Sequence, residues 1–320
     1  MSLSLTAATD DDGRRLDRIL RKALRSLPLS AIHRLLRQGC VRVNGETAAA
    51  ARRIRSGETI TVIDTIVSPG RAEPNAGCGK RLEILFEGSG LLILNKPAGL
   101  AVHGEAGTRG PREAHLADQV LSYLSPKLPP SLSFKPGPLH RLDKPSSGVI
   151  TFSSSLQGAR LFSAMMRERQ IKKFYLALVQ GRLKEAEVWQ DELSRDENLK
   201  KTFTGEGSGG KSKAAITRVK ALARNAACTL ILAEIETGRS HQIRAQAAAR
   251  GHPLLGDKKY GGGPFPQSSS AFMLHAWRME FPAHSPFPDL PGLIEAPLPD
   301  YFRAKIRELF GAEAAEALIF

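Results

Sequence analysis

A stretch without regular pattern divides the chain into two parts, and this break limits what the whole chain can fold into. Residues 64–80 lack hydrophobic periodicity. They contain residues that interrupt helices and strands, among them Pro69, Gly70, Pro74 and Gly77. With 320 residues the chain is long enough for two domains, each with its own core. We therefore expect a small domain over 14–63, a linker over 64–80 and a larger domain over 81–320.

The first part predicts two short helices followed by a β-hairpin. Apolar residues recur at helical spacing over 16–24, and a second helix is expected over 29–38. The dipeptide Asn44-Gly45 follows an alternating Val-Arg-Val stretch and is a strong signal for a tight hairpin turn. A last strand is expected over 59–62.

Positive charge is concentrated in this first part. The whole chain has a formal net charge of +14. Residues 11–62 carry 12 Arg or Lys and 5 Asp or Glu, which is half of that net charge. Such an excess favours a polyanionic partner, although it can also serve solubility alone. Short helices together with concentrated charge favour RNA binding over a merely solvated helix face.

The second part predicts many strands with scattered helices, which indicates an α+β domain. We expect a mixed, mainly antiparallel sheet with flanking helices. Strands are expected over 82–86, 91–95, 148–153, 174–179, 216–222, 229–236 and 272–281. Helices are expected near 114–124, 156–169, 241–249 and 301–310.

A phosphate-binding-loop pattern, G-x-x-x-x-G-K-S, occurs over 205–212. Such a loop needs a buried strand before it and a helix after it. The preceding residues 196–201 are largely charged and polar, and residues 215–220 alternate like a half-exposed strand. The glycine-rich sequence more simply predicts a flexible hairpin tip. An NTPase is therefore only a third hypothesis.

The cysteines and the N-terminus favour a reducing, cytoplasmic setting. The three cysteines are far apart and form no Cys-x-x-Cys pair: Cys40, Cys78 and Cys228. Residues 1–13 are polar and lack the pattern of a signal peptide, and no apolar stretch approaches the ~20 residues of a membrane span. The histidines do not fall at metal-ligand spacings, so we expect no metal.

One carboxylate lies among cationic and turn-forming residues near the middle of the chain. The segment is His140-Arg141-Leu142-Asp143-Lys144-Pro145-Ser146-Ser147-Gly148. An isolated Arg-x-Asp is more often a surface turn with an ion pair. On a basic chain, an acid held among bases also suits chemistry on a nucleic acid. The remaining motifs decide between these two interpretations.

Further motifs follow this segment or precede it. They are Asn95-Lys96-Pro97-Ala98-Gly99-Leu100, Tyr175-Leu176-Ala177, Thr237-Gly238-Arg239-Ser240-His241-Gln242-Ile243-Arg244 and Gly251-His252-Pro253-Leu254-Leu255-Gly256-Asp257. With the His-Arg-Leu-Asp segment, they make the chain resemble the RluA-type pseudouridine synthase family. Within that family the resemblance is to the C and D branch, whose members act on the large ribosomal RNA and carry an N-terminal S4 RNA-binding domain. It covers about residues 14–300.

This resemblance implies an isomerase that converts uridine in RNA to pseudouridine. No cofactor is expected, because the base is both the leaving group and the incoming nucleophile. The expected substrate is large-subunit (23S) ribosomal RNA, with no DNA or membrane partner, and the expected state is a monomer. A non-catalytic S4-type RNA-binding factor in ribosome assembly is the alternative.

The resemblance also implies roles for individual residues. Asp143 matches the essential aspartate, which could attack the sugar as a nucleophile or remove a sugar proton as a base. Arg244 matches the arginine that pairs with this aspartate, and a nearby cation favours an ionised carboxylate. Tyr175 and Ile243 match residues that pack on the flipped uracil. Arg141 is expected to fill the vacated space or to hold the RNA backbone.

Two neighbours of Asp143 complete the expected substrate-binding set. His140 is expected to shape the turn rather than to transfer protons, and Leu142 lies between these groups in the motif. In the S4-like domain, three arginines match phosphate contacts: Arg18, Arg34 and Arg37. Phosphate contacts would supply affinity and salt dependence rather than sequence choice.

Overall fold

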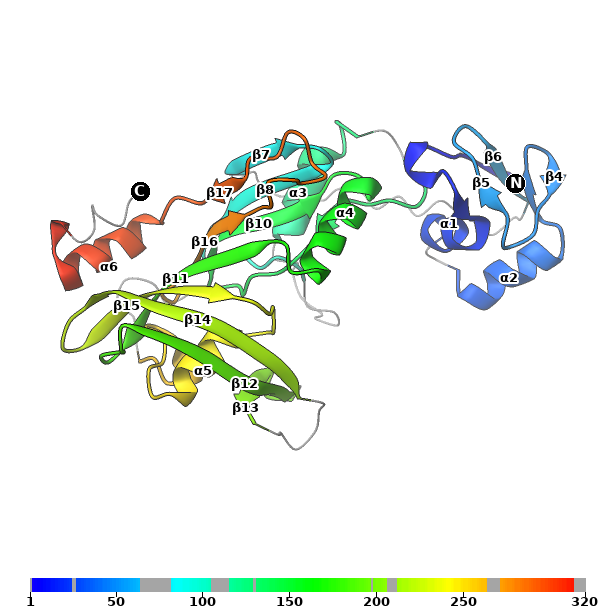
Figure 1. The fold of residues 1–320 in the computed structure, drawn as a ribbon. Coiled ribbons are helices and arrows are strands. Elements are labelled where there is room, and N and C mark those ends of the chain that lie inside the picture. Colours follow the sequence, from blue (N-terminus) through cyan, green and yellow to red (C-terminus); the bar gives the residue numbers. More distant parts are fainter. Residues whose placement is uncertain are drawn as a thin grey trace. The chain divides into compact units, whose positions relative to one another are not determined.

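The computed structural model describes residues 2–24, 27–63, 82–104, 115–128, 131–196, 198–205, 212–263 and 271–313. The chain forms two compact units (Figure 1). The first comprises Met1–Gly79, Asp118–Gly137 and Ser153–Arg160, and the second comprises Lys80–Ala117, Pro138–Phe152 and Leu161–Phe320. The expected linker over 64–80 lies outside the described residues, and the domain boundaries stay predictions.

The first unit contains a four-stranded sheet in the order β1-β6-β3-β4. Its strands are β1 (Ser2–Thr6), β2 (Arg14–Arg15), β3 (Val41–Val43), β4 (Glu46–Thr47), β5 (Arg53–Ile54) and β6 (Thr59–Ile63), with β2 paired to β5. Its helical segments include η1 (Thr9–Asp11), α1 (Leu16–Ala23) and α2 (Leu29–Arg37). The predicted helices, hairpin and last strand are confirmed, whereas β1 was not predicted.

The apolar faces of α1 and α2 build the core of this unit. Ile19 and Ile32 are completely buried together with Ile60 of β6. Their spacing turns one face of each helix inward and leaves the polar face outside. The hairpin turn forms at the predicted dipeptide, with φ values of 51° at Asn44 and 89° at Gly45. Asn and Gly adopt this left-handed region more readily than other residues.

A later segment of the chain belongs to this unit and is held by Asp11. Leu132 packs on the core of the unit, and its backbone N–H donates to Asp11 Oδ2 at 3.0 Å. Ser133 Oγ donates to Asp11 Oδ1, and Arg14 Nη1 donates to Ser133 Oγ at 2.9 Å. Asp11 is completely buried, so these hydrogen bonds offset the removal of its carboxylate from water.

The second unit is built on one large sheet in the order β13-β12-β14-β15-β11-β16-β10-β8-β7 (Figure 1). β10 runs parallel to β16, whereas β11, β12, β13, β14 and β15 pair with antiparallel neighbours. The expected mixed, mainly antiparallel sheet is therefore confirmed. The strands are β7 (Ile84–Gly88), β8 (Leu91–Lys96), β9 (Gly137–Pro138), β10 (Ser147–Ser153), β11 (Lys172–Gln180), β12 (Ala186–Asp196), β13 (Lys201–Thr204), β14 (Lys213–Arg224), β15 (Cys228–Ile235), β16 (Leu274–Glu280) and β17 (Leu293–Glu295).

Helices pack on both faces of this sheet. The remaining helical segments of the chain are α3 (Leu116–Leu124), which falls mainly in the first unit, α4 (Leu156–Arg167), which is divided between the units, and α5 (Gln242–Ala249), η2 (Lys258–Tyr260) and α6 (Asp300–Phe310) of the second unit. Phe302 of α6 packs with Leu176 of β11, and Ala245 of α5 packs with Leu193 of β12. Successive side chains of a strand point to opposite faces. Tyr175 of β11 therefore faces the side that carries α5.

The structure adds strands that the sequence did not predict and corrects one predicted turn. β12 and β13 were missed. Both β13 and β14 pair with β12, so the glycine-rich residues between them do not form the tip of a hairpin of adjacent strands. Residues 206–211 themselves lie outside the described residues. β14 stands where a phosphate-binding loop would need a helix, which removes the NTPase hypothesis.

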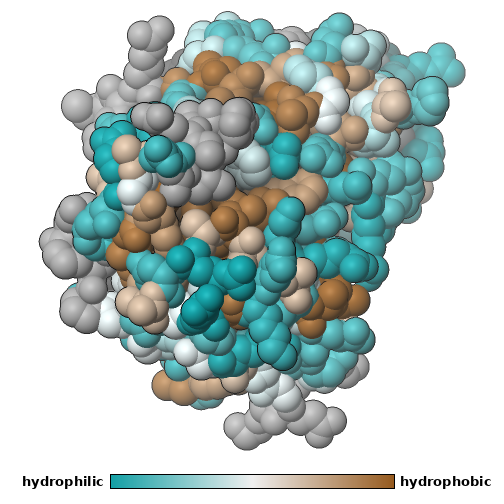
Figure 2. Space-filling model, turned by 60° about the vertical axis from the view of Figure 1, so that its left-hand side comes forward, coloured by the Kyte–Doolittle hydropathy of each residue, from teal (hydrophilic) through white to brown (hydrophobic). Residues whose placement is uncertain are grey.

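The surface carries few large apolar side chains. On the face drawn in Figure 2, hydrophobic residues form separate patches between hydrophilic ones. The exposed large hydrophobic residues of the described ranges are Leu29, Ile63, Val188, Leu199, Phe203 and Leu293. Within the same ranges, the helices are too short or too polar to cross a membrane.

Candidate active site

Asp143 lies in the loop that leads into β10. The Ser146 N–H donates to the carbonyl of Asp143 at 3.0 Å and closes a turn. Gly148, at the start of the strand that follows, has a φ of 110°, and a Cβ there would lie 2.1 Å from the carbonyl oxygen of Ala276. Glycine alone fits this close approach. The sequence Pro-Ser-Ser-Gly therefore returns the chain directly into the sheet beside Asp143.

The buried Lys96, at the end of β8, ties a second loop to the loop of Asp143. Its Nζ donates to the carbonyl oxygens of Pro97 at 2.9 Å, Leu100 at 2.7 Å and Lys144 at 3.2 Å. Burial lowers the pKa of Lys96 to about 7, and the negative charge of Asp143 opposes part of this lowering. Lys96 at the end of β8 thus holds the backbone carbonyl of Lys144, the residue that follows Asp143.

Arg244 of α5 joins the carboxylates of Asp143 and Asp257. Its Nη1 donates to Asp143 Oδ2 at 2.7 Å, while Nε and Nη2 donate to the two oxygens of Asp257 at 2.6 and 2.8 Å. Burial acts to lower the pKa of Arg244, but hydrogen bonds and charges of the two aspartates outweigh it and raise the pKa. The two-pronged contact with Asp257 fixes the guanidinium plane and thereby aims Nη1 at Asp143.

Two aromatic rings and a histidine complete the surroundings of Arg244. Its Cζ lies 4.8 Å from the ring centroid of Tyr260 and 4.5 Å from that of Phe272. His241 has Nδ1 2.9 Å from the Tyr260 hydroxyl oxygen and Nε2 3.8 Å from Asp143 Oδ1. Burial lowers the pKa of His241 to about 4, against the opposing charge of Asp143. His241 is therefore neutral near pH 7.

The other residues expected around the uracil differ in exposure. Tyr175 of β11 is buried, which raises the pKa of its hydroxyl, and the charge of Asp143 acts in the same direction. Ile243, beside Arg244 in α5, and Leu142 are also buried, whereas Arg141 is exposed. The charge of Asp143 thus acts on the Tyr175 hydroxyl, whereas Arg141, two residues before Asp143, lies on the surface. Their roles stay predictions.

His140 is held as a hydrogen-bond acceptor. The Thr151 N–H donates to His140 Nε2 at 3.0 Å, and the imidazole stacks on Phe162 at 6.3 Å between ring centroids. Burial lowers the pKa of His140 to about 3, and the charge of Lys173 acts in the same direction. A neutral imidazole fixed between loop and strand suits the expected role in shaping the turn.

The three arginines expected to contact phosphates lie on the helices of the first unit. Arg18 is on α1, and Arg34 and Arg37 are on α2. All three side chains are exposed. They are therefore available to a partner, and their contact with RNA stays a prediction.

Comparison with known proteins agrees with this arrangement. A model of the S4 domain matches residues 14–60, and a model of the RNA pseudouridylate synthase family matches residues 90–249. The ribosomal large subunit pseudouridine synthase D of Nitrosomonas europaea is 32% identical over 96% of this chain and 88% of its own length. The chain belongs to the RNA pseudouridylate synthase family. The corresponding synthase C of Vibrio cholerae is 33% identical over 85% of this chain and 87% of its own length.

Solved structures of other pseudouridylate synthases share the fold. Human RNA pseudouridylate synthase domain containing 4 aligns with a TM-score of 0.55 and 22% identity, over 71% of this chain and 92% of that one. Human RNA pseudouridylate synthase domain containing 1 aligns with a TM-score of 0.53 and 24% identity, over 70% and 85%. Membership of a family of synthases removes the alternative of a non-catalytic assembly factor.

Sequence reasoning missed several groups that build the site of this pseudouridylate synthase. Asp257 ends a recognised motif, but it stands 13 residues after Arg244, and no spacing rule indicates that the two side chains meet. Tyr260 follows two lysines and gives no periodic signal. Lys96 belongs to a recognised motif, but its three carbonyl partners lie in two different loops. A lysine at the end of a largely apolar strand was the one available signal.

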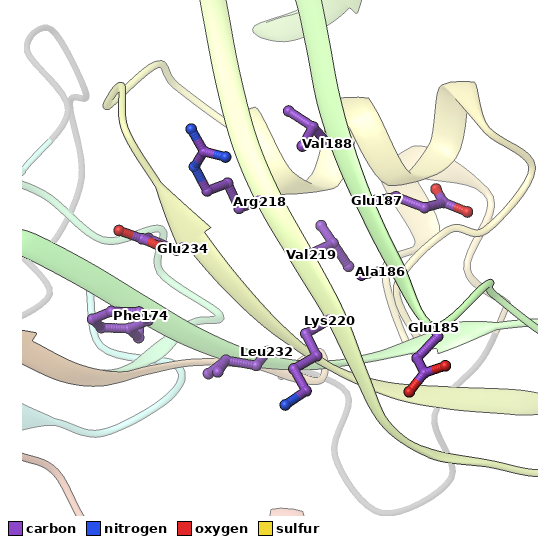
Figure 3. Close-up of a pocket in the computed structure, with 10 residues that line it drawn as sticks. All are labelled: Phe174, Glu185, Ala186, Glu187, Val188, Arg218, Val219, Lys220, Leu232 and Glu234. Carbon is purple, nitrogen blue, oxygen red and sulfur yellow. The ribbon is translucent and has the colours of Figure 1, made fainter.

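A groove of about 570 Å³ lies on the other face of the sheet and is not part of this site (Figure 3). Phe174, Leu232 and Glu234 line it from β11 and β15, together with residues of β12 and β14. Because Phe174 and Tyr175 are consecutive in β11, their side chains point to opposite faces of the sheet. The described residues that line the groove include no predicted site residue.

Proposed function

We propose that this pseudouridine synthase isomerises uridines of large-subunit ribosomal RNA, with Asp143 as the catalytic carboxylate. The contact of 2.7 Å between Arg244 Nη1 and Asp143 Oδ2 carries the proposal, because it holds a charged partner against a carboxylate in a half-buried site. The substrate class is supported by the relatives, which are named ribosomal large subunit pseudouridine synthases C and D. The basic S4 domain supports an RNA partner.

The reaction exchanges one bond of the ribose C1′ for another. The bond from N1 to C1′ breaks, the uracil turns within the site, and a bond forms between C5 and C1′. The proton of C5 leaves while N1 gains one, so the composition of the nucleotide is unchanged. Asp143 acts as a nucleophile on the sugar or as a base that removes a sugar proton. Both routes need a carboxylate held in a fixed direction, which Arg244 supplies.

The target uridine must leave its stack to reach Asp143. Tyr175 and Ile243 then pack against the uracil, and the exposed Arg141 fills the vacated space or holds the backbone. His140 and Leu142 shape the loop that presents Asp143. The exposed arginines of the S4 domain bind phosphates elsewhere on the same RNA.

Two further predictions accompany this function. The synthase works as a monomer, which size-exclusion chromatography with light scattering tests. It works in the cytoplasm, where an enzyme acting on ribosomal RNA of the large subunit meets its substrate, and localisation of the tagged protein tests this.

Mapping of pseudouridine in ribosomal RNA tests the proposed substrate. Deletion of the gene should remove pseudouridine from specific positions of the large-subunit RNA, and re-expression of the wild-type chain should restore it. An unchanged map of large-subunit RNA, or a loss confined to transfer RNA, would overturn the substrate class.

A further inference from the structure

An aromatic and a basic side chain share one face of the edge strand β13. Phe203 is 38% exposed, and Lys201 Nζ lies 5.2 Å from the centroid of its ring. β13 is the last strand of the large sheet. The backbone of Thr202 is already engaged, because its N–H donates to the Tyr260 hydroxyl at 2.9 Å and its carbonyl oxygen accepts from that hydroxyl at 3.0 Å. A partner at this place therefore meets the side chains of β13 rather than a free strand edge.

Short distances between side chains lead from this strand to the catalytic carboxylate. Lys201 Nζ lies 4.9 Å from the centroid of the Tyr260 ring, and the hydroxyl of Tyr260 lies 2.9 Å from His241 Nδ1. His241 Nε2 is 3.8 Å from Asp143 Oδ1. Lys201 is thus separated from Asp143 by two side chains, those of Tyr260 and His241.

A second lysine adds positive charge beside the same site. Lys259 of η2 is exposed, and its Nζ donates to the carbonyl of Lys200 at 2.7 Å, next to the start of β13. Its pKa is lowered by burial and by the charges of Arg244, Arg195 and Lys201, while Asp143 opposes this. The lysine is therefore surrounded mainly by other cations.

The nearby carboxylates are largely occupied by other groups. Asp143 and Asp257 both accept from Arg244. Asp196, the register partner of Lys201, accepts the backbone N–H groups of Asn198 and Leu199 through Oδ1. These three carboxylates are directed mainly at other groups, so Lys201 and Lys259 suit an anion that arrives from outside the chain.

We propose that Lys201, Phe203 and Lys259 bind single-stranded RNA immediately beside the target uridine. The two lysines contact phosphodiester groups of the strand, and a neighbouring base stacks on the Phe203 ring. Lysines interleaved with an exposed aromatic ring are the usual means of holding unpaired nucleotides. A strand from which one nucleotide is turned out exposes such bases and phosphates next to the reacting uridine. This binding rests on the proposed function and adds a second RNA-binding surface, distinct from the S4 domain.

Binding of an unmodified transcript of large-subunit RNA, measured by fluorescence anisotropy over a range of salt concentrations, tests this surface. Two changes act on different parts of it: the double variant Lys201→Gln/Lys259→Gln and the single variant Phe203→Ala. The matched controls lie by the groove, near the other end of β12: Lys184→Gln/Lys220→Gln and Val188→Ala. Lys184, Lys220 and Val188 are all exposed.

The double lysine variant should bind about tenfold more weakly. Its negative slope of log affinity against log salt should become shallower by about 1.4, or about 0.7 for each phosphate that is no longer bound. Phe203→Ala should weaken binding at least about fivefold with an unchanged slope. The controls should stay within about twofold of the wild type. Lys201→Arg/Lys259→Arg keeps the charges and should restore both affinity and slope.

Equal losses of affinity in variants and controls, or an unchanged affinity in folded variants, would overturn the proposed surface. Pseudouridine formation by the wild-type chain is measured on the same transcript. A wild type that forms pseudouridine while its variants bind normally refutes only this surface. A wild type that forms none, while its variants bind weakly, refutes the proposed function and supports the RNA-binding surface.

Discussion

Arg244 donates from Nη1 to Asp143 Oδ2 at 2.7 Å, and its Nε and Nη2 donate to another carboxylate, that of Asp257. Arg244 is 5% exposed, and its guanidinium contacts the rings of Tyr260 and Phe272. The guanidinium has little freedom to turn, because each of these contacts restricts the same plane. The direction of the Asp143 carboxylate therefore depends on groups that are buried behind it.

Replacement Asp257→Asn should lower the rate of pseudouridine formation by about 10²-fold, because a guanidinium released from its anchor no longer aims Nη1 at Asp143. The substitution keeps the shape of the side chain and removes its charge. Single-turnover kinetics on an RNA transcript measure the effect. Asp191→Asn is the matched control, since Asp191 also pairs with an arginine after α5, namely Arg250 at 2.9 Å. An Asp257→Asn enzyme as fast as this control would contradict the anchoring role.

The pH dependence of stability should report on Lys96. Its pKa falls from 10.5 to about 7 in the folded chain, so between pH 7 and 10.5 the unfolded chain binds a proton that the folded chain does not. Stability from this group therefore increases as pH rises through that window. Urea unfolding at pH 7 and 9.5 should show a gain of about 3 kcal/mol that Lys96→Met loses. The exposed control Lys220→Met should keep the gain; a Lys96→Met chain with the full gain would refute the assignment.

Replacement Gly148→Ala should destabilise the second unit by at least about 3 kcal/mol, because a Cβ would lie 2.1 Å from the carbonyl oxygen of Ala276 and the φ of 110° is strained for alanine. Thermal unfolding measures the loss. Gly292→Ala, which meets nothing within 4 Å, should change stability by less than about 0.5 kcal/mol. Equal stability of the two variants would show that β10 can move away from β16.

Replacement of Arg18, Arg34 and Arg37 by glutamine should make the negative slope of log affinity against log salt shallower by about two to three. Each arginine is expected to neutralise one phosphate. Filter binding of a large-subunit RNA transcript at several salt concentrations gives the slope. The charge-matched control carries glutamine at Arg182, Lys184 and Lys220, which are all exposed. If the control loses as much slope, the effect comes from net charge and not from the S4 helices.

The sequence predicted two kinds of strand: apolar runs that are buried on both faces, such as β8, and strands whose two faces differ in burial, such as β14. Residues 216–222 alternate because Thr217 and Val219 are buried while Arg218 and Lys220 are exposed, and β14 was found from this pattern. β12 was missed since Asp191 occupies the side that faces α5, where it binds Arg250. Charged residues on both faces of a strand remove the alternation of apolar and polar residues from which the strand is recognised.

The site was predictable only as far as its motifs reach. Asp143 and Arg244 stand 101 residues apart, and the resemblance to a family linked them before any geometry was known. Asp257 and Lys96 act through buried contacts with a guanidinium and with carbonyl oxygens. Such contacts depend on how distant loops meet, which neither composition nor spacing encodes.

Pseudouridine formation by the purified wild type and by Asp143→Asn, on an unmodified large-subunit RNA transcript, tests the central claim most directly. Asn keeps the size of the side chain and can serve neither as nucleophile nor as base, so the variant should be slower by at least about 10³-fold in single turnover while its circular dichroism stays that of a folded chain. A folded Asp143→Asn enzyme that converts uridine at the wild-type rate would contradict the account.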